Sequence, residues 1–503
     1  MTGVDRRALL GAIQGITSGP GAAEDLSDEE LFRSLYPVPS QAKAFNLDKI
    51  LVVGGRGTGK TQIFRALLDP KGREAVARTA GVKLVNDVAK MILVEGFSAG
   101  RASQPDHPNH PAADAIEAVL EGDDGVRARR FWVGVCLARI LLNPAAAALL
   151  DEKDRRSLQE LTGNAAASPR TILGWVESDV ERPFAILDAL DRAASARGQS
   201  CVVTFDALDR VANRWETFGT VVGGLLSLAL DVYRRNRAVR LKIFLRPDLE
   251  SDAALSFPDA SKLRGYREQL EWSRADLYRL VFKRMMAEPR YGEEAHRSIE
   301  GIVGPDLVTC VPPLGWVPEP NFDEPRQEAV MTHLAGRYMG ANARKGLTYT
   351  WVPNHLADAQ RQVSPRSFLV ALSKAAEEMI ARPAVAVAGT GVLSPTSLME
   401  GVTAASTQRV EELAEDFPWI RDVRRAMQGL LVPCRDSDLL DRLSRLELTG
   451  AQKGLRSSDP RSILGQLAEL GVVYANMDGR YNVPDLYRVG MNMKRKGGIR
   501  LVR

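Results

Sequence analysis

The stretch Ile50-Leu51-Val52-Val53-Gly54-Gly55-Arg56-Gly57-Thr58-Gly59-Lys60-Thr61 decides the fold of this 503-residue chain. An apolar run leads into the pattern G-x-x-x-x-G-K-[ST], and the helix-like residues 62–68 follow it. This order predicts a buried strand, a phosphate-binding loop (P-loop) and a helix. Glycines in such a loop let backbone N–H groups converge on phosphate oxygens at the positive end of the helix.

The P-loop predicts a site for ATP and Mg²⁺. Lys60 is expected to reach the β- and γ-phosphates, and the hydroxyl of Thr61 is expected to ligate Mg²⁺. The alternative is a glycine-rich turn without a ligand, which the match of both motif and context disfavours. The predicted nucleotide-binding residues of the loop are Gly54, Gly55, Arg56, Gly57, Thr58, Gly59, Lys60 and Thr61.

Two further strand-like runs supply candidate partners for the loop. Residues 201–205 are rich in β-formers and end at Asp206, which is expected to hold Mg²⁺ from a strand beside the first one. Residues 239–245 alternate as a third strand, and Arg246 follows them as a candidate sensor of the γ-phosphate. Arg246 is otherwise a surface arginine before a turn. The alternation of strands and helices predicts parallel strands with the ligand at their carboxyl ends.

The predicted fold class is α/β: a P-loop NTPase with a parallel sheet, a helical insertion, a helical lid and a C-terminal winged helix. Residues 1–45 are expected to form a helical lead-in, and residues 46–285 the ATPase domain. The helical insertion is expected at about residues 84–190. Residues 286–430 are predicted to form the lid, and residues 431–503 the winged helix with a basic tail.

The C-terminal region shows the order helix, helix, hairpin. Helical patterns at 438–446 and 459–471 precede Asp478-Gly479, a strong hairpin signal. This order is typical of a winged helix, which binds either DNA or protein. The second helix carries only Arg461 as a cation and also carries Glu469, so a protein contact is favoured.

Composition is that of an ordinary soluble protein, with 45% hydrophobic and 26% charged residues. The four cysteines are far apart and fit neither a disulfide framework nor a zinc site. No long apolar stretch or signal-peptide pattern is present, so a cytoplasmic location is expected. Of the net charge of +4, residues 488–503 contribute +6, which leaves −2 for the rest of the chain. Only this tail has the charge of a nucleic-acid binder, and a solvated tail is the alternative.

These motifs resemble the STAND and KAP groups, two branches of the AAA-type P-loop ATPases. The resemblance rests on the P-loop, on Asp206-x-x-Asp209-Arg210, on Arg246 and on the helix start Ser364-Pro365-Arg366. It covers about residues 46 to 490 and includes the terminal winged helix. Only the P-loop and the acidic strand end are specific motifs.

The resemblance implies that ATP is held between the sheet and a helical lid, and that it switches the protein between closed and assembly-competent states. Asp206 would order Mg²⁺, Asp209 would polarise water, and Arg246 and Arg366 would sense the nucleotide. Many AAA-type enzymes have glutamate directly after the magnesium-binding aspartate. Ala207 occupies that position here, which implies slow hydrolysis.

The leading hypothesis is a switch ATPase that forms a homo-oligomer or changes shape to control a separate effector or sensor protein, in antiviral defence or signalling. The alternative is a DNA-binding ATPase similar to origin-recognition proteins, which would use the winged helix and the basic tail. A small-molecule kinase fits less well, because the winged helix has no role in it. If the protein is a ring-forming motor, Arg264, Arg267 and Arg284 are candidates for an arginine that reaches a neighbouring subunit.

Overall fold

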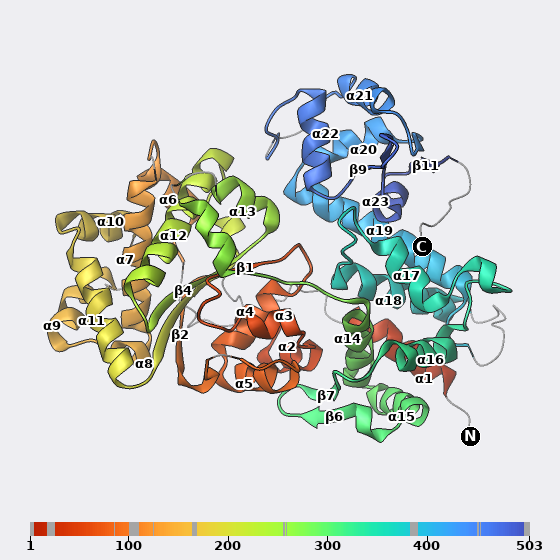
Figure 1. The fold of residues 1–503 in the computed structure, drawn as a ribbon, viewed down its shortest axis with the longest axis horizontal. Coiled ribbons are helices and arrows are strands. Elements are labelled where there is room, and N and C mark those ends of the chain that lie inside the picture. The colour runs from red at the N-terminus through yellow and green to blue at the C-terminus, as the bar shows by residue number, and fades with distance from the viewer. Residues whose placement is uncertain are drawn as a thin grey trace. The chain divides into compact units, whose positions relative to one another are not determined.

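The computed structural model forms two compact units (Figure 1). The P-loop unit comprises Gly19–Glu271 and Val311–Leu314, and the helical unit comprises Met1–Ser18, Trp272–Cys310 and Gly315–Arg503. None of the helices that the structure describes is both long and apolar enough to cross a membrane. The structure describes residues 5–17, 26–84, 86–99, 110–123, 125–162, 168–254, 257, 259–382, 391–449, 452 and 454–496.

A five-stranded parallel sheet forms the centre of the P-loop unit and confirms the predicted α/β class. The strands are arranged in the order β2-β3-β4-β1-β5. Because all strands run in the same direction, their carboxyl ends lie at one edge of the sheet, where ligands of such sheets bind. The strands are β1 (Leu51–Val53), β2 (Met91–Phe97), β3 (Ser200–Phe205), β4 (Val239–Leu245) and β5 (Arg267–Gln269).

The strand order corrects one prediction. The strand that ends at Asp206, β3, does not lie beside β1, because β4 pairs with both of them. Two strands were also missed. One of them, β2, lies inside the insertion at 84–190 that was expected to be helical, and the other, β5, is an edge strand beside β1.

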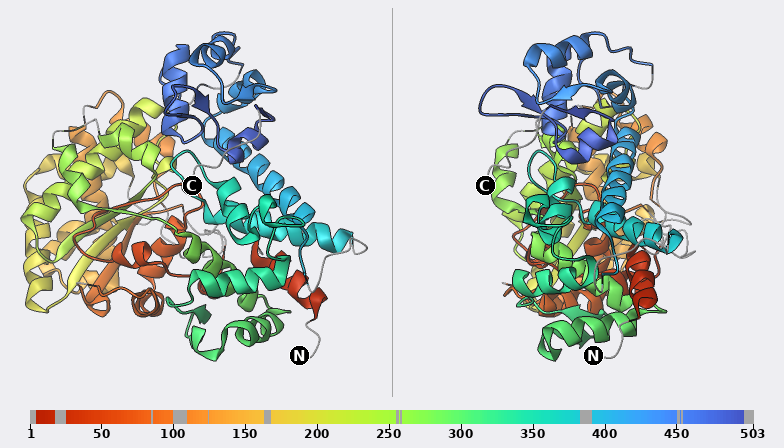
Figure 2. Two further views of the ribbon diagram at one scale, coloured as in Figure 1. Left: turned by 45° about the vertical axis from the view of Figure 1, so that its right-hand side comes forward. Right: turned by 90° about the vertical axis from the view of Figure 1, so that its right-hand side faces the viewer.

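Helices cover both faces of the sheet (Figure 2). On one face, Phe64 of the helix after the P-loop meets Phe244 edge to face, with ring centroids 5.6 Å apart. On the other face, Trp132 packs against Phe205 at 5.5 Å within the large apolar core. The helices of this unit are α2 (Asp28–Ser34), α3 (Pro39–Lys43), α4 (Lys60–Leu68), α5 (Pro70–Thr79), α6 (Ala113–Leu120), α7 (Val126–Leu142), α8 (Pro144–Ala147), α9 (Glu152–Leu158), α10 (Pro169–Ser178), α11 (Arg182–Ala196), α12 (Trp215–Arg235) and α13 (Pro247–Ala254).

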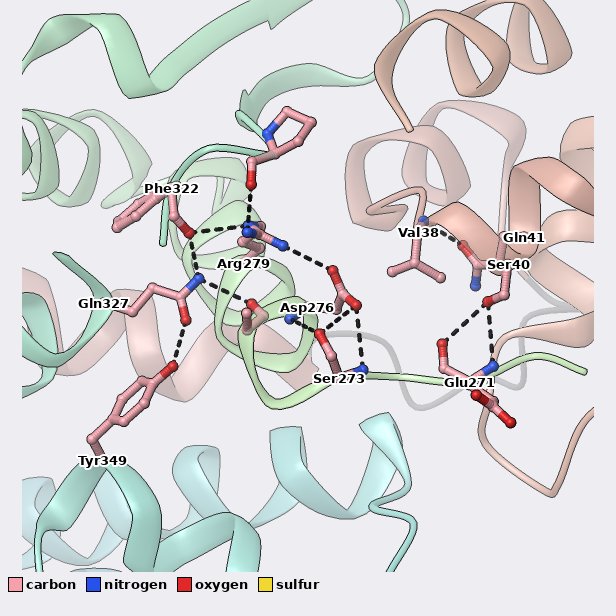
Figure 3. A network of polar contacts seen from close by, with 12 residues as sticks. Val38, Ser40, Gln41, Glu271, Ser273, Asp276, Arg279, Phe322, Gln327 and Tyr349 are labelled. Atoms are coloured by element: carbon pink, nitrogen blue, oxygen red, sulfur yellow. Dashed lines mark hydrogen bonds and ion pairs between the residues drawn. The ribbon is translucent and has the colours of Figure 1, made fainter. Parts of the chain in front are cut away.

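The helical unit contains a buried polar network around Gln327 (Figure 3). The Gln327 amide donates to the carbonyls of Phe322 and Ala275 and accepts from the Tyr349 hydroxyl at 2.7 Å. Every polar atom of this buried side chain is therefore bonded, which fixes how its helix packs. The larger elements of this unit are α1 (Arg6–Gln14), α14 (Arg274–Ala287), α15 (Gly292–Val303), β6 (Val308–Val311), β7 (Gly315–Pro318), α16 (Glu324–Ala335), α17 (Thr348–Leu356), α18 (Pro365–Ala381) and α19 (Pro395–Asp416).

The division into units differs from the predicted segments. The lead-in of residues 1–45 does not stay together, since α1 belongs to the helical unit, whereas α2 and α3 belong to the P-loop unit. The expected ATPase boundary at 285 also differs, because the P-loop unit ends at Glu271. Ser273 instead caps α14 of the other unit, and its hydroxyl accepts from the Asp276 N–H at 3.1 Å.

The end of the chain has two helices followed by a hairpin, in the predicted order. Asp459 caps the second helix, because its carboxylate accepts from the N–H of Ser462 at 3.0 Å. A short parallel strand pair and two more helices join these elements, and residues 497–503 of the basic tail lie outside the described residues. The elements are α20 (Ile420–Met427), β8 (Leu431–Val432), α21 (Asp436–Ser444), α22 (Pro460–Glu469), β9 (Tyr474–Ala475), β10 (Tyr481–Asn482), α23 (Asp485–Gly490) and β11 (Lys494–Arg495).

A buried lysine ties the chain before β1 to the sheet. Lys242 of β4 is 2% exposed, and its Nζ donates to the carbonyls of Ala44, Asn46 and Lys49 at 2.6, 3.0 and 2.5 Å. Burial lowers the pKa of Lys242 to about 7. Three acceptors, however, use all three N–H groups of the ammonium, so the geometry favours the charged form.

Replacing this lysine tests its role in the fold. Lys242→Met is expected to lower the free energy of unfolding by about 2–3 kcal/mol, because three buried carbonyls lose their donor. Urea denaturation followed by circular dichroism measures this change. Lys262→Met is the control, because Lys262 is exposed and pairs only with Asp259, and it should change stability by less than about 1 kcal/mol. If Lys242→Met and Lys262→Met lowered the free energy of unfolding equally, the proposed role of Lys242 in the fold would be contradicted.

Candidate nucleotide-binding site

The backbone between β1 and α4 has the shape of an anion-binding loop. The N–H of Gly54 donates to the carbonyl of Leu245 at 3.1 Å, which joins the start of the loop to β4. Gly57 and Gly59 have φ values of 81° and 93°, a region that favours glycine. No side chain caps the start of α4 at Gly59, so the first N–H groups of the helix are available to an anion.

Close packing within the loop explains its first glycine. A Cβ at Gly54 would lie 2.5 Å from Oγ1 of Thr58, which is too close for any side chain. The Thr58 hydroxyl in turn donates to the carbonyl of Gly55 at 2.8 Å. The loop is therefore closed by its own contacts, and Arg56 at its tip is half-buried.

Lys60 lies folded over its own loop. Its Nζ donates to the carbonyl of Gly54 at 2.7 Å and to that of Gly55 at 3.0 Å. Burial lowers the pKa of Lys60 to about 8, and the negative charge of Asp206 opposes this shift. A cation held here by two carbonyls is placed to exchange them for phosphate oxygens.

Asp206 lies beside Lys60 at the carboxyl end of β3. The side chain is buried, which raises the pKa of Asp206 to about 6, while the charge of Lys60 and a hydrogen bond from Thr61 oppose the shift. The structure therefore brings the Thr61 hydroxyl and the Asp206 carboxylate together. Two oxygen donors at a phosphate-binding loop fit Mg²⁺, which takes few protein ligands and completes its shell with phosphates and water. Their role in metal binding stays a prediction.

The strand that ends at Asp206 is not followed directly by a second acidic residue, because position 207 is an alanine. Ala207 has a φ of 53°, in the left-handed region that is unfavourable for alanine. The chain then turns into a short 3₁₀ segment, Leu208–Arg210, in which Asp209 is exposed. The charge of Asp209 acts on the pKa of both Lys60 and Asp206, so this carboxylate lies within electrostatic range of the site.

Arg246 also belongs to this edge of the sheet. Its guanidinium makes a bidentate contact with Asp248, through Nε at 3.1 Å and NH2 at 2.8 Å, and only 14% of the side chain is exposed. The charges of both groups influence the pKa of Lys60. Arg246 is thus not an exposed surface arginine, although its sensor role stays a prediction.

The predicted arginines of the helical unit have local partners. Arg366 lies at the start of α18, and its NH1 is 3.6 Å from Oε1 of Glu412. Arg284 is half-buried, and its NH1 donates to the carbonyl of Ile16 at 2.9 Å within the same unit. Its role as an arginine that reaches a neighbouring subunit stays a prediction.

Sequence reasoning missed a buried polar cluster at the carboxyl end of β2. Nε2 of His110 accepts from the N–H of Ser98 at 3.1 Å and lies 3.6 Å from Oε1 of Glu95. NH2 of Arg139 lies 2.9 Å from Nδ1 of the same ring. The sequence does place polar residues after the apolar run of β2, but no strand was predicted there. In the sequence, His107 and His110 form a loop histidine pair that is only a weak signal for a metal site, and His107 lies outside the described residues.

Comparisons with known proteins assign no family. No family model matches the chain, and no curated protein matches it. The ORC2 protein of Aeropyrum pernix, solved as ADPNP–ADP complexes, aligns with 13% identity over 95% of this chain and 96% of its own, with a TM-score of 0.36. CDC6P from Pyrobaculum aerophilum aligns with 12% identity over 92% of this chain and 97% of its own, with a TM-score of 0.31. At these scores neither protein supports an argument about this chain.

The raised pKa of Asp206 predicts how magnesium acts at different pH values. With a pKa of about 6, the carboxylate is mostly protonated at about pH 5 and mostly ionised at about pH 7. The gain in ATP affinity caused by Mg²⁺ should therefore decrease over this range as the pH falls. Calorimetric titration with ATP in Mg²⁺ and in EDTA measures the gain.

Two controls make this experiment specific. For Asp206→Asn, Mg²⁺ should increase the affinity for ATP only a little at any pH. The same variant serves as the control for titration of the nucleotide itself. Protonation of Asp206 does not itself destabilise the fold, because its folded-state pKa lies above its usual value, so proton uptake at this group through about pH 6 favours the folded state. If Mg²⁺ increased the ATP affinity of the wild type equally at about pH 5 and about pH 7, the prediction would be contradicted.

Proposed function

We propose that this protein is an ATP-binding, slowly hydrolysing switch ATPase. The observation that carries the proposal is the convergence of three groups: Lys60 on the P-loop, the Thr61 hydroxyl at the start of α4, and the buried Asp206 carboxylate. A structural turn would not need to hold a half-buried lysine beside a buried aspartate, because each charge loses hydration there. A phosphate–magnesium ligand compensates both charges.

The arrangement supports a mechanism based on positioning and electrostatics. Backbone N–H groups of Gly57 to Lys60 hold the phosphates, and the Lys60 ammonium moves from its loop carbonyls to phosphate oxygens. Bound Mg²⁺ would neutralise phosphate charge between Thr61 and Asp206. Asp209 is the candidate that orients water, and Ala207 offers no carboxylate, which supports slow turnover.

A switch needs a group whose contacts change with the nucleotide. Arg246 is such a group, since its guanidinium is bound to Asp248 close to Lys60. A γ-phosphate would compete with Asp248 for this guanidinium, as a charge-assisted bidentate acceptor. Arg366, paired with Glu412 in the helical unit, is the candidate sensor on the lid side. We infer that the signal passes to a homo-oligomer interface or to a separate partner protein.

A DNA-binding ATPase is the second candidate, and the ion pairs of the C-terminal elements do not favour it. Arg480 pairs with Asp478, and Arg488 and Arg495 both pair with Asp485. Cations that already have carboxylate partners give little free charge for phosphate contacts. Two of the four cations in the described part of the basic tail are thus paired, while Lys494 and Lys496 are exposed. This partial neutralisation favours a protein-contacting role for the region, in antiviral defence, in signalling or elsewhere.

Removing the loop lysine tests nucleotide binding. Lys60→Ala is expected to weaken MgATP binding by at least about 100-fold and to reduce phosphate release to background, because the phosphates lose their buried cation. Calorimetry and a phosphate-release assay measure the two effects. Lys262→Ala removes an exposed lysine and should leave both unchanged. Unaltered MgATP binding by Lys60→Ala would refute the proposed function.

A size measurement tests the switch. We expect the protein with a non-hydrolysable ATP analogue to elute or scatter as a larger species, or in a changed shape, compared with the nucleotide-free protein. Light scattering combined with small-angle X-ray scattering distinguishes these two responses. Lys60→Ala is expected not to hold the analogue, so it should show neither a larger species nor a changed shape. A wild type that binds the analogue without any change in size or shape would leave an ATPase but exclude the switch.

A further inference from the structure

Gln41 has a hydrogen-bond donor that nothing in its surroundings uses. The residue lies on α3, ahead of β1, and is fully buried. Its Oε1 accepts from the N–H of Val38 at 3.2 Å (Figure 3). Its Nε2 is also buried, but has no hydrogen-bond partner among the described residues. The Val38 donor fixes which end of the amide is oxygen, so the free end is a nitrogen.

This free nitrogen lies against the P-loop. The position that a Cβ would take at Gly59 is 3.0 Å from Nε2 of Gln41 and 3.7 Å from Oε1 of Gln62. Gly59 is the last residue before α4, where the uncapped N–H groups begin. The unused donor of Gln41 is therefore at the edge of the surface on which a phosphate ligand would lie.

Leaving a buried amide N–H without an acceptor is unfavourable by roughly the full cost of its desolvation. The neighbouring polar groups of α3 are satisfied, as Ser40 shows: its hydroxyl donates to the carbonyl of Glu271 at 3.1 Å and accepts from the Glu271 N–H at 3.2 Å. The unsatisfied donor is thus specific to the side chain that faces Gly59. A ligand that places an acceptor atom beside this donor would satisfy it.

We propose that Gln41 binds the nucleotide through its Nε2–H, as a donor from outside the P-loop motif. The inference rests on the proposed nucleotide binding and adds a residue from the preceding helix to the site. The acceptor is an oxygen or nitrogen atom of the nucleotide, on the phosphates or on the nucleoside. Gln41 does not act on the reacting bond, so its contribution is to affinity.

Two substitutions at this position test the contact. Gln41→Glu keeps an oxygen for the Val38 N–H but removes the donor and adds a negative charge. Gln41→Met removes the whole amide. We expect MgATP to bind about five- to tenfold more weakly to Gln41→Met, which is the effect of one neutral hydrogen bond, and more weakly still to Gln41→Glu. Ser40→Ala, on the same helix, should bind as the wild type does.

Calorimetry with MgATP and with magnesium tripolyphosphate distinguishes the acceptors. Equal losses with both ligands would place the contact on the phosphates, and a loss with MgATP alone would place it on the nucleoside. Thermal unfolding shows whether Gln41→Glu keeps the fold, as the retained Val38 contact predicts. A folded Gln41→Glu that binds both ligands as tightly as the wild type would overturn this inference alone. A wild type that binds neither ligand would overturn the proposed function and this inference with it.

Discussion

Two opposite charges, the half-buried Lys60 and the buried Asp206, lie at the carboxyl edge of the sheet, and the P-loop unit depends on keeping them there. Each side chain loses hydration, and the opposing pKa shifts, to about 8 and about 6, record that loss. Their mutual attraction compensates only part of it. The strand order makes the pair possible, since β4 separates the ends of β1 and β3 and leaves room between them for a ligand.

Local sequence predicted the elements that have strong local signals. The strand, loop and helix of residues 50–68 are in place, and so are the helical pattern within 459–471 and the hairpin around Asp478-Gly479. Each of these depends on neighbours a few residues away. The same holds for the position of Asp206 at a strand end, which required only an apolar run and the acid that follows it.

Other features depend on contacts that local sequence does not encode. The short edge strand β5 consists of Arg267, Glu268 and Gln269, which carry no apolar signal and pair only because β1 lies beside them. The position of β4 between β1 and β3 is determined by how the strands pair in the sheet, and the sequence of no single segment encodes it. The free donor of Gln41 likewise exists only because α3 packs against Gly59, 18 positions further along the chain. Such sites become visible only once the packing is known.

The backbone at Ala207 limits how the proposed ATPase could be converted into a fast one. A glutamate introduced there would have to adopt the left-handed conformation with φ near 53°, which alanine already adopts at this position. Its carboxylate would also leave the chain at a different angle from that of a residue in an extended strand. A design for rapid turnover would therefore have to remodel the turn at 207–210 as well, so the proposed low rate would be a property of the backbone and not of one missing side chain.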